Sequence, residues 1–145
     1  MKIYTIGFTK KSAETFFGLL REAQVRTLVD IRLNNVSQLA GFTKRDDLKY
    51  FLNEICDIRY SHRVDLAPAQ SMLDDYKKRD VSWADYEDRF LKLMEHRHIE
   101  DTVPKELLDN AALLCSEDKP LQCHRRLVVE YLSRHWDDIT IQHLT

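Results

Sequence analysis

Glycine and proline are scarce in this chain, with 3 of each among 145 residues. Long flexible linkers and low-complexity stretches depend on these residues, so the sequence excludes both. Gly7, Gly18 and Gly41 are also too far apart to form a dinucleotide-binding fingerprint or a Walker-type phosphate loop. Two common nucleotide-binding motifs are therefore excluded.

Cysteine is equally scarce, and the 3 cysteines cannot all pair within one chain. A chain of 145 residues with 43% hydrophobic content forms a core that needs no disulfide. Its N-terminal segment lacks the apolar stretch of a secretory signal, and no apolar run reaches the roughly 20 residues that cross a bilayer. We therefore expect one domain over residues 1–145, cytoplasmic, with no membrane partner and with thiols that are free or bound to a metal.

An excess of charge of one sign is also absent, because 22 basic and 24 acidic residues give a formal net charge of -2. This balance excludes a nucleic-acid binder that relies on bulk electrostatics. It is compatible with a local basic rim, for which the candidates are Arg32, Lys44, Arg45, Arg63, Arg125 and Arg126.

Hydrophobic periodicity alternates between strand and helix along the chain. Strand patterns occupy Lys2–Ile6, Val25–Ile31, Ile58–His62, Ala111–Cys115 and Ile139–Leu144. Helical patterns lie between them, over Ser12–Ala23, Arg45–Cys56, Ala69–Asp109 and Cys123–Trp136. Such alternation favours right-handed crossovers, so we predict an α/β fold: a three-layer sandwich around a mainly parallel sheet of about five strands.

Two groups of residues in the predicted helices receive structural interpretations. Trp83, Tyr86 and Phe90 recur at helical spacing, which favours a core stripe covering the sheet over a cofactor-binding box. Cys56 falls in an apolar helix, where we expect it to pack as a small hydrophobic residue.

Polar residues gather at the ends of the first four predicted strands. Gly7 and Thr9 follow the first strand, and Asp30 and Arg32 lie at the end of the second. His62 ends the third strand and Cys115 ends the fourth. Carboxyl ends of parallel strands meet at one edge of a sheet, where α/β folds bind ligands. We therefore expect these residues to surround one water-accessible hollow. The structural alternatives are a simple Asp30–Arg32 pair, a packed His62 and an inert core thiol at Cys115.

The segment Cys115–Arg126 carries the strongest signal. A strand ends at its first residue, and a helix opens near Cys123 and His124. Backbone amides at a helix start attract anions and lower the pKa of a nearby cysteine. Arg125 or Arg126 in the first turn can add a bidentate grip on phosphate or carboxylate. The arrangement resembles the plan of cysteine phosphatases and rhodaneses, although two acidic residues in the loop disfavour phosphate.

The same segment allows a metal interpretation. Cys115, Cys123, His124 and the distant His62 make a nitrogen and sulfur set of the kind that zinc prefers. Adjacent residues such as Cys123 and His124 rarely bind one tetrahedral ion together. We therefore predict no metal site, and the sequence names no cofactor.

The ordered motifs resemble those of the domain of unknown function 488 family of bacteria and archaea. They are Thr5-Ile6-Gly7, Leu28-Val29-Asp30-Ile31-Arg32, Tyr60-Ser61-His62, Leu114-Cys115 and Cys123-His124-Arg125. The resemblance spans nearly the whole chain. The family places a histidine after the first-strand glycine, where this chain has Phe8. The resemblance implies a compact α/β domain with a polar site at the strand edge, and it specifies no reaction.

Two functions are consistent with these observations. The first is a cysteine-assisted enzyme that binds a small anionic, phosphate-like or nucleotide-like ligand. Its catalytic candidates are Cys115, Cys123, Asp30 and His62, and its anion-binding candidates are Gly7, Thr9, Arg32, His124, Arg125 and Arg126. The second is a non-catalytic module that binds nucleic acid or protein through the basic rim. The oligomeric state stays open.

Overall fold

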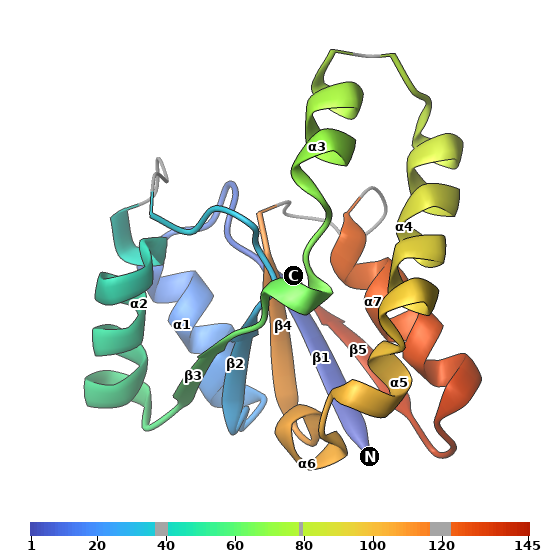
Figure 1. Cartoon of the computed structure of the whole chain (residues 1–145). Coiled ribbons are helices and arrows are strands. Elements are labelled where there is room, and N and C mark those ends of the chain that lie inside the picture. The colour runs from blue at the N-terminus through green and yellow to red at the C-terminus, as the bar shows by residue number, and fades with distance from the viewer. Residues whose placement is uncertain (37–40, 79, 117–122) are drawn as a thin grey trace.

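The computed structural model describes residues 1–36, 41–78, 80–116 and 123–145. Five strands form one parallel sheet in the order β3-β2-β4-β1-β5 (Figure 1). Their bounds are β1 Lys2–Gly7, β2 Thr27–Asp30, β3 Arg59–His62, β4 Ala111–Cys115 and β5 Thr140–Leu144. The predicted α/β sandwich with a parallel sheet is confirmed. The second strand is shorter than predicted, because its ladder pairs only Thr27 to Asp30 with both neighbours.

The helices fall where the periodicity predicts them, with different ends. They are α1 Ala13–Glu22, α2 Arg45–Phe51, α3 Gln70–Lys77, α4 Trp83–Arg97, α5 Ile99–Thr102, α6 Lys105–Leu108 and α7 His124–His135. Two 3-10 helices, η1 Gly41–Thr43 and η3 Val64–Leu66, and a π-helical stretch, η2 Leu52–Cys56, accompany them. The helical region predicted over 69–109 is interrupted at His98, whose left-handed backbone (φ 52°) ends α4, and at Pro104, which precedes α6.

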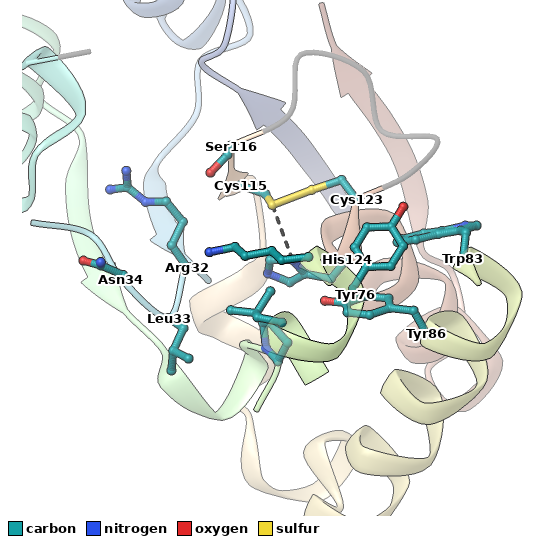
Figure 2. A pocket seen from close by; sticks show the side chains of 13 residues that line it. Arg32, Leu33, Asn34, Tyr76, Trp83, Tyr86, Cys115, Ser116, Cys123 and His124 are labelled. Atoms are coloured by element: carbon teal, nitrogen blue, oxygen red, sulfur yellow. Dashed lines mark hydrogen bonds between the residues drawn. A yellow bond between two sulfur atoms is a disulfide. The ribbon is translucent and has the colours of Figure 1, made fainter. Parts of the chain in front are cut away.

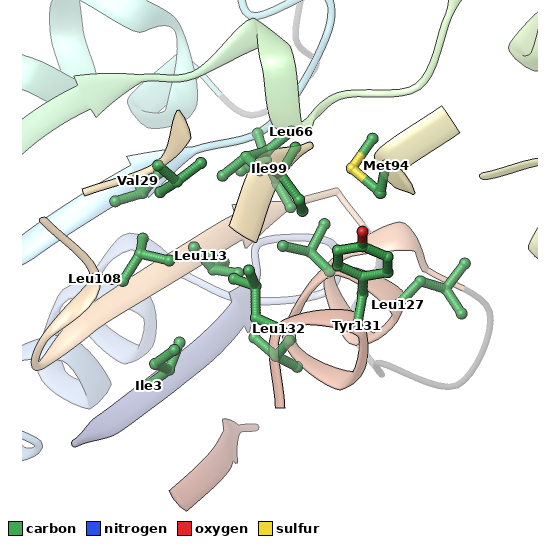
Figure 3. Close-up of a cluster of buried hydrophobic side chains, with 14 of the residues drawn as sticks. Ile3, Val29, Leu66, Met94, Ile99, Leu108, Leu113, Leu127, Tyr131 and Leu132 are labelled. Carbon is green, nitrogen blue, oxygen red and sulfur yellow. The ribbon is translucent and has the colours of Figure 1, made fainter. Parts of the chain in front are cut away.

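Two hydrophobic layers pack on opposite faces of the sheet. Helices α1 and α2 with η2 cover one face, and α4 to α7 cover the other (Figures 1 and 3). Side chains of the central strand β4 alternate between them, with Leu113 in one layer and Leu114 in the other. The predicted core stripe on α4 is confirmed, because Tyr86 and Phe90 are buried in the layer that contains Leu113.

The strand register aligns the carboxyl ends of four strands. Gly7 pairs with Cys115, and Asp30 pairs with both Leu114 and His62. Helix α3 and the first part of α4 project beyond this edge of the sheet (Figure 1). The projecting start of α4 is capped by Ser82, whose hydroxyl accepts a hydrogen bond from the Asp85 amide at 3.1 Å. The candidate residues therefore share an edge that these helices border on one side.

Across the described ranges, no helix is both long enough and apolar enough to span a lipid bilayer.

Candidate functional site

A cavity of about 450 Å³ lies at the carboxyl edge of the sheet. Among the described residues, its lining comes from Arg32 to Asn34 after β2, Pro68, the end of β4 with Ser116, the start of α7, α3 and the first turn of α4. Figure 2 shows Cys115, Cys123 and His124 in the middle, Arg32 and Asn34 on one side, and the aromatic residues Tyr76, Tyr86 and Trp83 on the other. The cavity thus joins a sulfur centre to an aromatic wall.

A disulfide links Cys115 to Cys123 in this cavity (Figure 2). Cys115 closes β4, and Cys123 caps the start of α7, so the two elements bring the sulfurs together although the residues are 8 apart in sequence. The expectation that these two thiols are free or metal-bound is therefore wrong. Cys56 is the unpaired cysteine and is half-buried, close to the prediction that it packs as a hydrophobic residue.

His124 is held beside this disulfide by the backbone of a neighbouring strand end. Its Nε2 lies 2.8 Å from the Ile31 carbonyl oxygen, which can only accept, so Nε2 carries the ring proton. Its Nδ1 lies 3.4 Å from the sulfur of Cys115. The lone pair of Nδ1 therefore faces the sulfur.

The charge state of His124 differs from the one an anion ligand needs. Burial lowers its pKa to about 4, and the nearby Arg125 charge acts in the same direction, against the Ile31 hydrogen bond. His124 is therefore neutral at pH 7. Because its one donor is taken by Ile31, the ring offers an acceptor to Cys115 instead of a donor to an anion.

Asp30 and Arg32 form the structural pair that the sequence left open. The Arg32 Nε and Nη2 atoms donate to the two Asp30 carboxylate oxygens, each at 2.8 Å, and Nη2 also donates to the Thr43 carbonyl. Tyr60 donates to Asp30 at 2.6 Å. Burial alone would raise the pKa of Asp30, but these hydrogen bonds and the Arg32 charge hold it below its usual value. Asp30 thus stays ionised and positions Arg32.

The backbone donors predicted near Gly7 are already engaged. The amides of Phe8 and Thr9 donate to the Ser116 carbonyl at 3.2 and 3.0 Å, and the Thr9 hydroxyl donates to the same oxygen at 2.6 Å. These groups therefore hold the residue that follows β4, and they are not directed at an anion. Gly7 lies beside Cys115 in the sheet and is not among the residues that line the cavity.

His62, Arg125 and Arg126 also lie outside the cavity lining. His62 contacts the Arg32 carbonyl oxygen through Nε2 at 2.8 Å, so it supports the backbone next to Asp30. Arg125 is fully buried. Arg126 bridges α7 to α4, with Glu130 at 2.9 Å and Glu87 at 3.1 Å. Neither arginine lines the cavity, so the anion grip predicted for them is not part of this site as the structure describes it.

The predicted basic rim is only partly present at the surface. Arg32 and Arg125 are buried, with 3% and 0% of their surfaces exposed. Arg63 pairs with Asp65 at 2.8 Å, and Arg45 pairs with Asp46 at 3.1 Å. Exposed Lys44 keeps its place at the surface. The two acidic residues of the loop that disfavour phosphate, Glu117 and Asp118, lie outside the described residues.

The family is decided by a match to the model described as Domain of unknown function DUF488, over residues 12–132. The chain belongs to this family. No curated protein and no solved structure matches it. The matched range contains Asp30, Arg32, both paired cysteines and His124, so the whole sulfur centre lies within the DUF488 domain.

The aromatic wall of the DUF488 cavity was missed as part of a site. The rings of Trp83 and Tyr86 stack with centroids 5.1 Å apart, and Tyr76 lies 5.1 Å from Tyr86. The same rings pack on the hydrophobic layer, so the core interpretation was correct but incomplete. Spacing within a helix shows which residues share a face, and it does not show that the end of that face borders a cavity. Lys77 at the end of α3 adds a cation to the lining.

The sulfur centre of this DUF488 chain has the ligand chemistry for a soft metal ion. The ligand atoms of Cys115, Cys123 and His124 all lie within 4.8 Å of one another. In the dithiol form they offer two thiolates and one nitrogen, and the Ile31 hydrogen bond orients the histidine as a metal ligand requires. His62 is not in this set, so the four-ligand group considered from the sequence does not form among the described residues.

Proposed function

We propose that this DUF488 protein is an enzyme that uses the Cys115 thiolate as a nucleophile on a small anionic molecule bound in the cavity. The observation that carries the proposal is the contact of 3.4 Å between the Cys115 sulfur and Nδ1 of His124. A neutral histidine with its free nitrogen on a cysteine sulfur is the arrangement of a nucleophile and its base. Ile31 orients that base through its carbonyl oxygen.

The reactive form is the dithiol. In it, Nδ1 of His124 takes the proton of the Cys115 thiol, and the thiolate attacks an electrophilic carbon or phosphorus atom of the substrate. The leaving group departs with its electron pair and takes the proton from His124. Water then cleaves the covalent intermediate with His124 again as base, and the thiol is regenerated. The thiolate itself favours protonation of its histidine partner during the reaction.

Three features support an anionic substrate. Exposed Lys77 lines the cavity, the 12-residue helix α7 begins at it, and Arg32 borders it. Asp30 neutralises much of the Arg32 charge, so Lys77 and the helix start are the main sources of positive potential. The proposed roles of Asp30 and His62 are accordingly positioning roles on the backbone and side chain of Arg32.

The test is the alkylation rate of the reduced protein with iodoacetamide and with anionic iodoacetate, using glutathione as the reference thiol. We expect Cys115, located by peptide mass mapping, to react at pH 7 at least tenfold faster than glutathione. Relative to glutathione, iodoacetate should also be favoured over iodoacetamide. Equal rates for glutathione, Cys115 and Cys123 would end the nucleophile proposal.

Matched variants show which side chains cause the fast alkylation of Cys115. His124→Gln keeps an amide donor for Ile31 but removes the nitrogen beside the sulfur, so both rates should fall towards that of glutathione, because no base remains beside the thiol. Lys77→Gln should lower the iodoacetate rate alone. Cys56→Ser is the control and should leave the Cys115 rates unchanged, because Cys56 lies outside the cavity lining.

The non-catalytic alternative, a nucleic-acid or protein module, has weaker support because Arg32 and Arg125 are buried. An oligonucleotide titration at low ionic strength tests its nucleic-acid form, and absence of binding there would exclude that form.

A further inference from the structure

We infer that Cys123 is the resolving partner of Cys115 and that the two form a reversible dithiol–disulfide couple, through which the protein exchanges electrons with small thiols in the cavity. The inference rests on the proposed nucleophile role of Cys115 and adds an activity to it. Both sulfurs belong to residues that line the cavity, yet their residues are only 6% and 3% exposed. A small thiol can enter a cavity of about 450 Å³, whereas a folded protein substrate cannot.

The two sulfurs occupy different environments, and the difference sets the direction of exchange. Cys123 is the N-cap of α7, where the helix dipole stabilises a departing thiolate. Cys115 has Nδ1 of His124 at 3.4 Å, placed to take the proton of an incoming thiol. An incoming thiol is therefore expected to attack Cys115, with Cys123 as the leaving group, because exchange is fastest through the sulfur whose partner leaves most easily.

Each step balances in atoms and electrons. The incoming thiol loses its proton to His124 and forms a bond to the Cys115 sulfur, while the Cys115–Cys123 bond breaks and its electron pair goes to Cys123. A second small thiol attacks the substrate sulfur of this mixed disulfide, and Cys115 leaves with the electron pair. Two thiols are thus oxidised to one small disulfide, and the protein gains two electrons and two protons. The reverse sequence reduces a small disulfide.

The cavity also indicates the kind of thiol. Its exposed cation is Lys77, while Arg32 is paired with Asp30, and its far wall is aromatic, so an acidic thiol is favoured over a basic one. Glutathione, which is acidic overall, and cysteamine, which is cationic, are suitable opposing probes. We expect glutathione to reduce the disulfide faster than cysteamine does, after correction for the rates of both with a model disulfide.

The experiment equilibrates the full-length protein in glutathione buffers of increasing oxidised fraction, quenches with an alkylating agent and counts modified cysteines by mass. We expect a reversible two-electron transition confined to Cys115 and Cys123, and the Cys56→Ser control should show the same midpoint. Circular dichroism at each point establishes that the protein stays folded. A pair that never oxidises, or that oxidises or reduces only when the protein unfolds, overturns the inference.

Trapping assigns the two roles. Cys123→Ser should accumulate a glutathione adduct on Cys115, while Cys115→Ser should form several-fold less adduct on Cys123. The opposite pattern shows that Cys123 is not the resolving residue. Failure of this inference is distinguishable from failure of the proposed enzyme. Rapid alkylation of Cys115 without a reversible couple would support the enzyme and contradict the redox couple. A reversible couple with ordinary alkylation rates would contradict the enzyme.

Discussion

Two buried ionisable side chains border the sulfur centre, and different neighbours fix their charge. Asp30 keeps its negative charge because Arg32 and Tyr60 donate to both carboxylate oxygens. His124 stays neutral because burial opposes its charging. Asp30, which stays charged, positions Arg32, and His124, which stays neutral, presents a lone pair to Cys115. The proposed chemistry at this site therefore depends on keeping His124 unprotonated.

The lowered pKa of His124 predicts a loss of stability in acid. The unfolded chain binds a proton near pH 6.5 and the folded chain only near pH 4, so the contribution is fully present above pH 6.5 and is lost as the pH falls towards 4. Each pKa unit corresponds to about 1.4 kcal/mol. Between pH 7.5 and 4.5, the wild-type free energy of unfolding should fall by about 2 to 3 kcal/mol more than that of His124→Gln.

Urea unfolding of both proteins at the two pH values measures this difference. Carboxyl groups with lowered pKa values, such as Asp30, also weaken the fold in acid, but they do so in both proteins and cancel. Parallel losses in wild type and variant would show that His124 is not held neutral by burial.

At the scale of elements, the aromatic side of the cavity depends on the packing of α3 against α4. Arg97, in the last turn of α4, donates through Nη1 to the carbonyl oxygens of Asp65 at 2.8 Å and Ala67 at 2.7 Å. These bonds tie the segment before α3 to α4. Since α3 carries Tyr76 and Lys77, and α4 carries Trp83 and Tyr86, this tie joins the two helices that form the aromatic side of the cavity.

Replacing Arg97 should therefore affect stability and reactivity together. In Arg97→Ala two carbonyl oxygens lose a charged donor, and we expect a loss of about 2 kcal/mol in the free energy of unfolding. The preference of Cys115 for iodoacetate should also fall, because Lys77 is less firmly placed. The matched control on the same helix is Lys92→Ala. Solvent screens its exposed pair with Asp88, so Lys92→Ala should leave the free energy of unfolding nearly unchanged. Equal effects of the two variants would contradict this role of Arg97.

At the scale of the whole molecule, a single sheet separates two hydrophobic layers and couples them. Leu113 and Leu114 are consecutive residues of β4 that pack into opposite layers, and both are fully buried. A change in one layer therefore acts on the strand that also supports the other. Trp83 and Trp136 both report on the layer that contains Leu113.

This coupling predicts cooperative unfolding of the two layers. Leu114→Ala removes packing from the layer without tryptophan and should cost about 3 kcal/mol. The urea midpoints from tryptophan fluorescence and from circular dichroism should nevertheless shift together. Leu113→Ala is the matched change on the other face. A fluorescence midpoint that stays in place in Leu114→Ala would show that the layers unfold separately.

Sequence alone determined the elements and the edge at which the polar residues meet. The alternation of strand and helix patterns depends on local periodicity, and it predicts parallel strands. Because parallel strands carry their carboxyl ends to one side, the proximity of Asp30, Arg32 and Cys115 could be predicted. The resemblance to the DUF488 family is confirmed by the match over residues 12–132.

Only the tertiary structure decided what each of these residues does. Whether Arg126 grips a ligand depends on Glu87, which lies on another helix 39 residues away in sequence. The free nitrogen of His124 depends on a carbonyl 93 residues away, and the aromatic wall depends on where α3 ends and α4 begins relative to the sheet. Roles of this kind depend on long-range partners and burial, and neither is encoded in the spacing of residues along the chain.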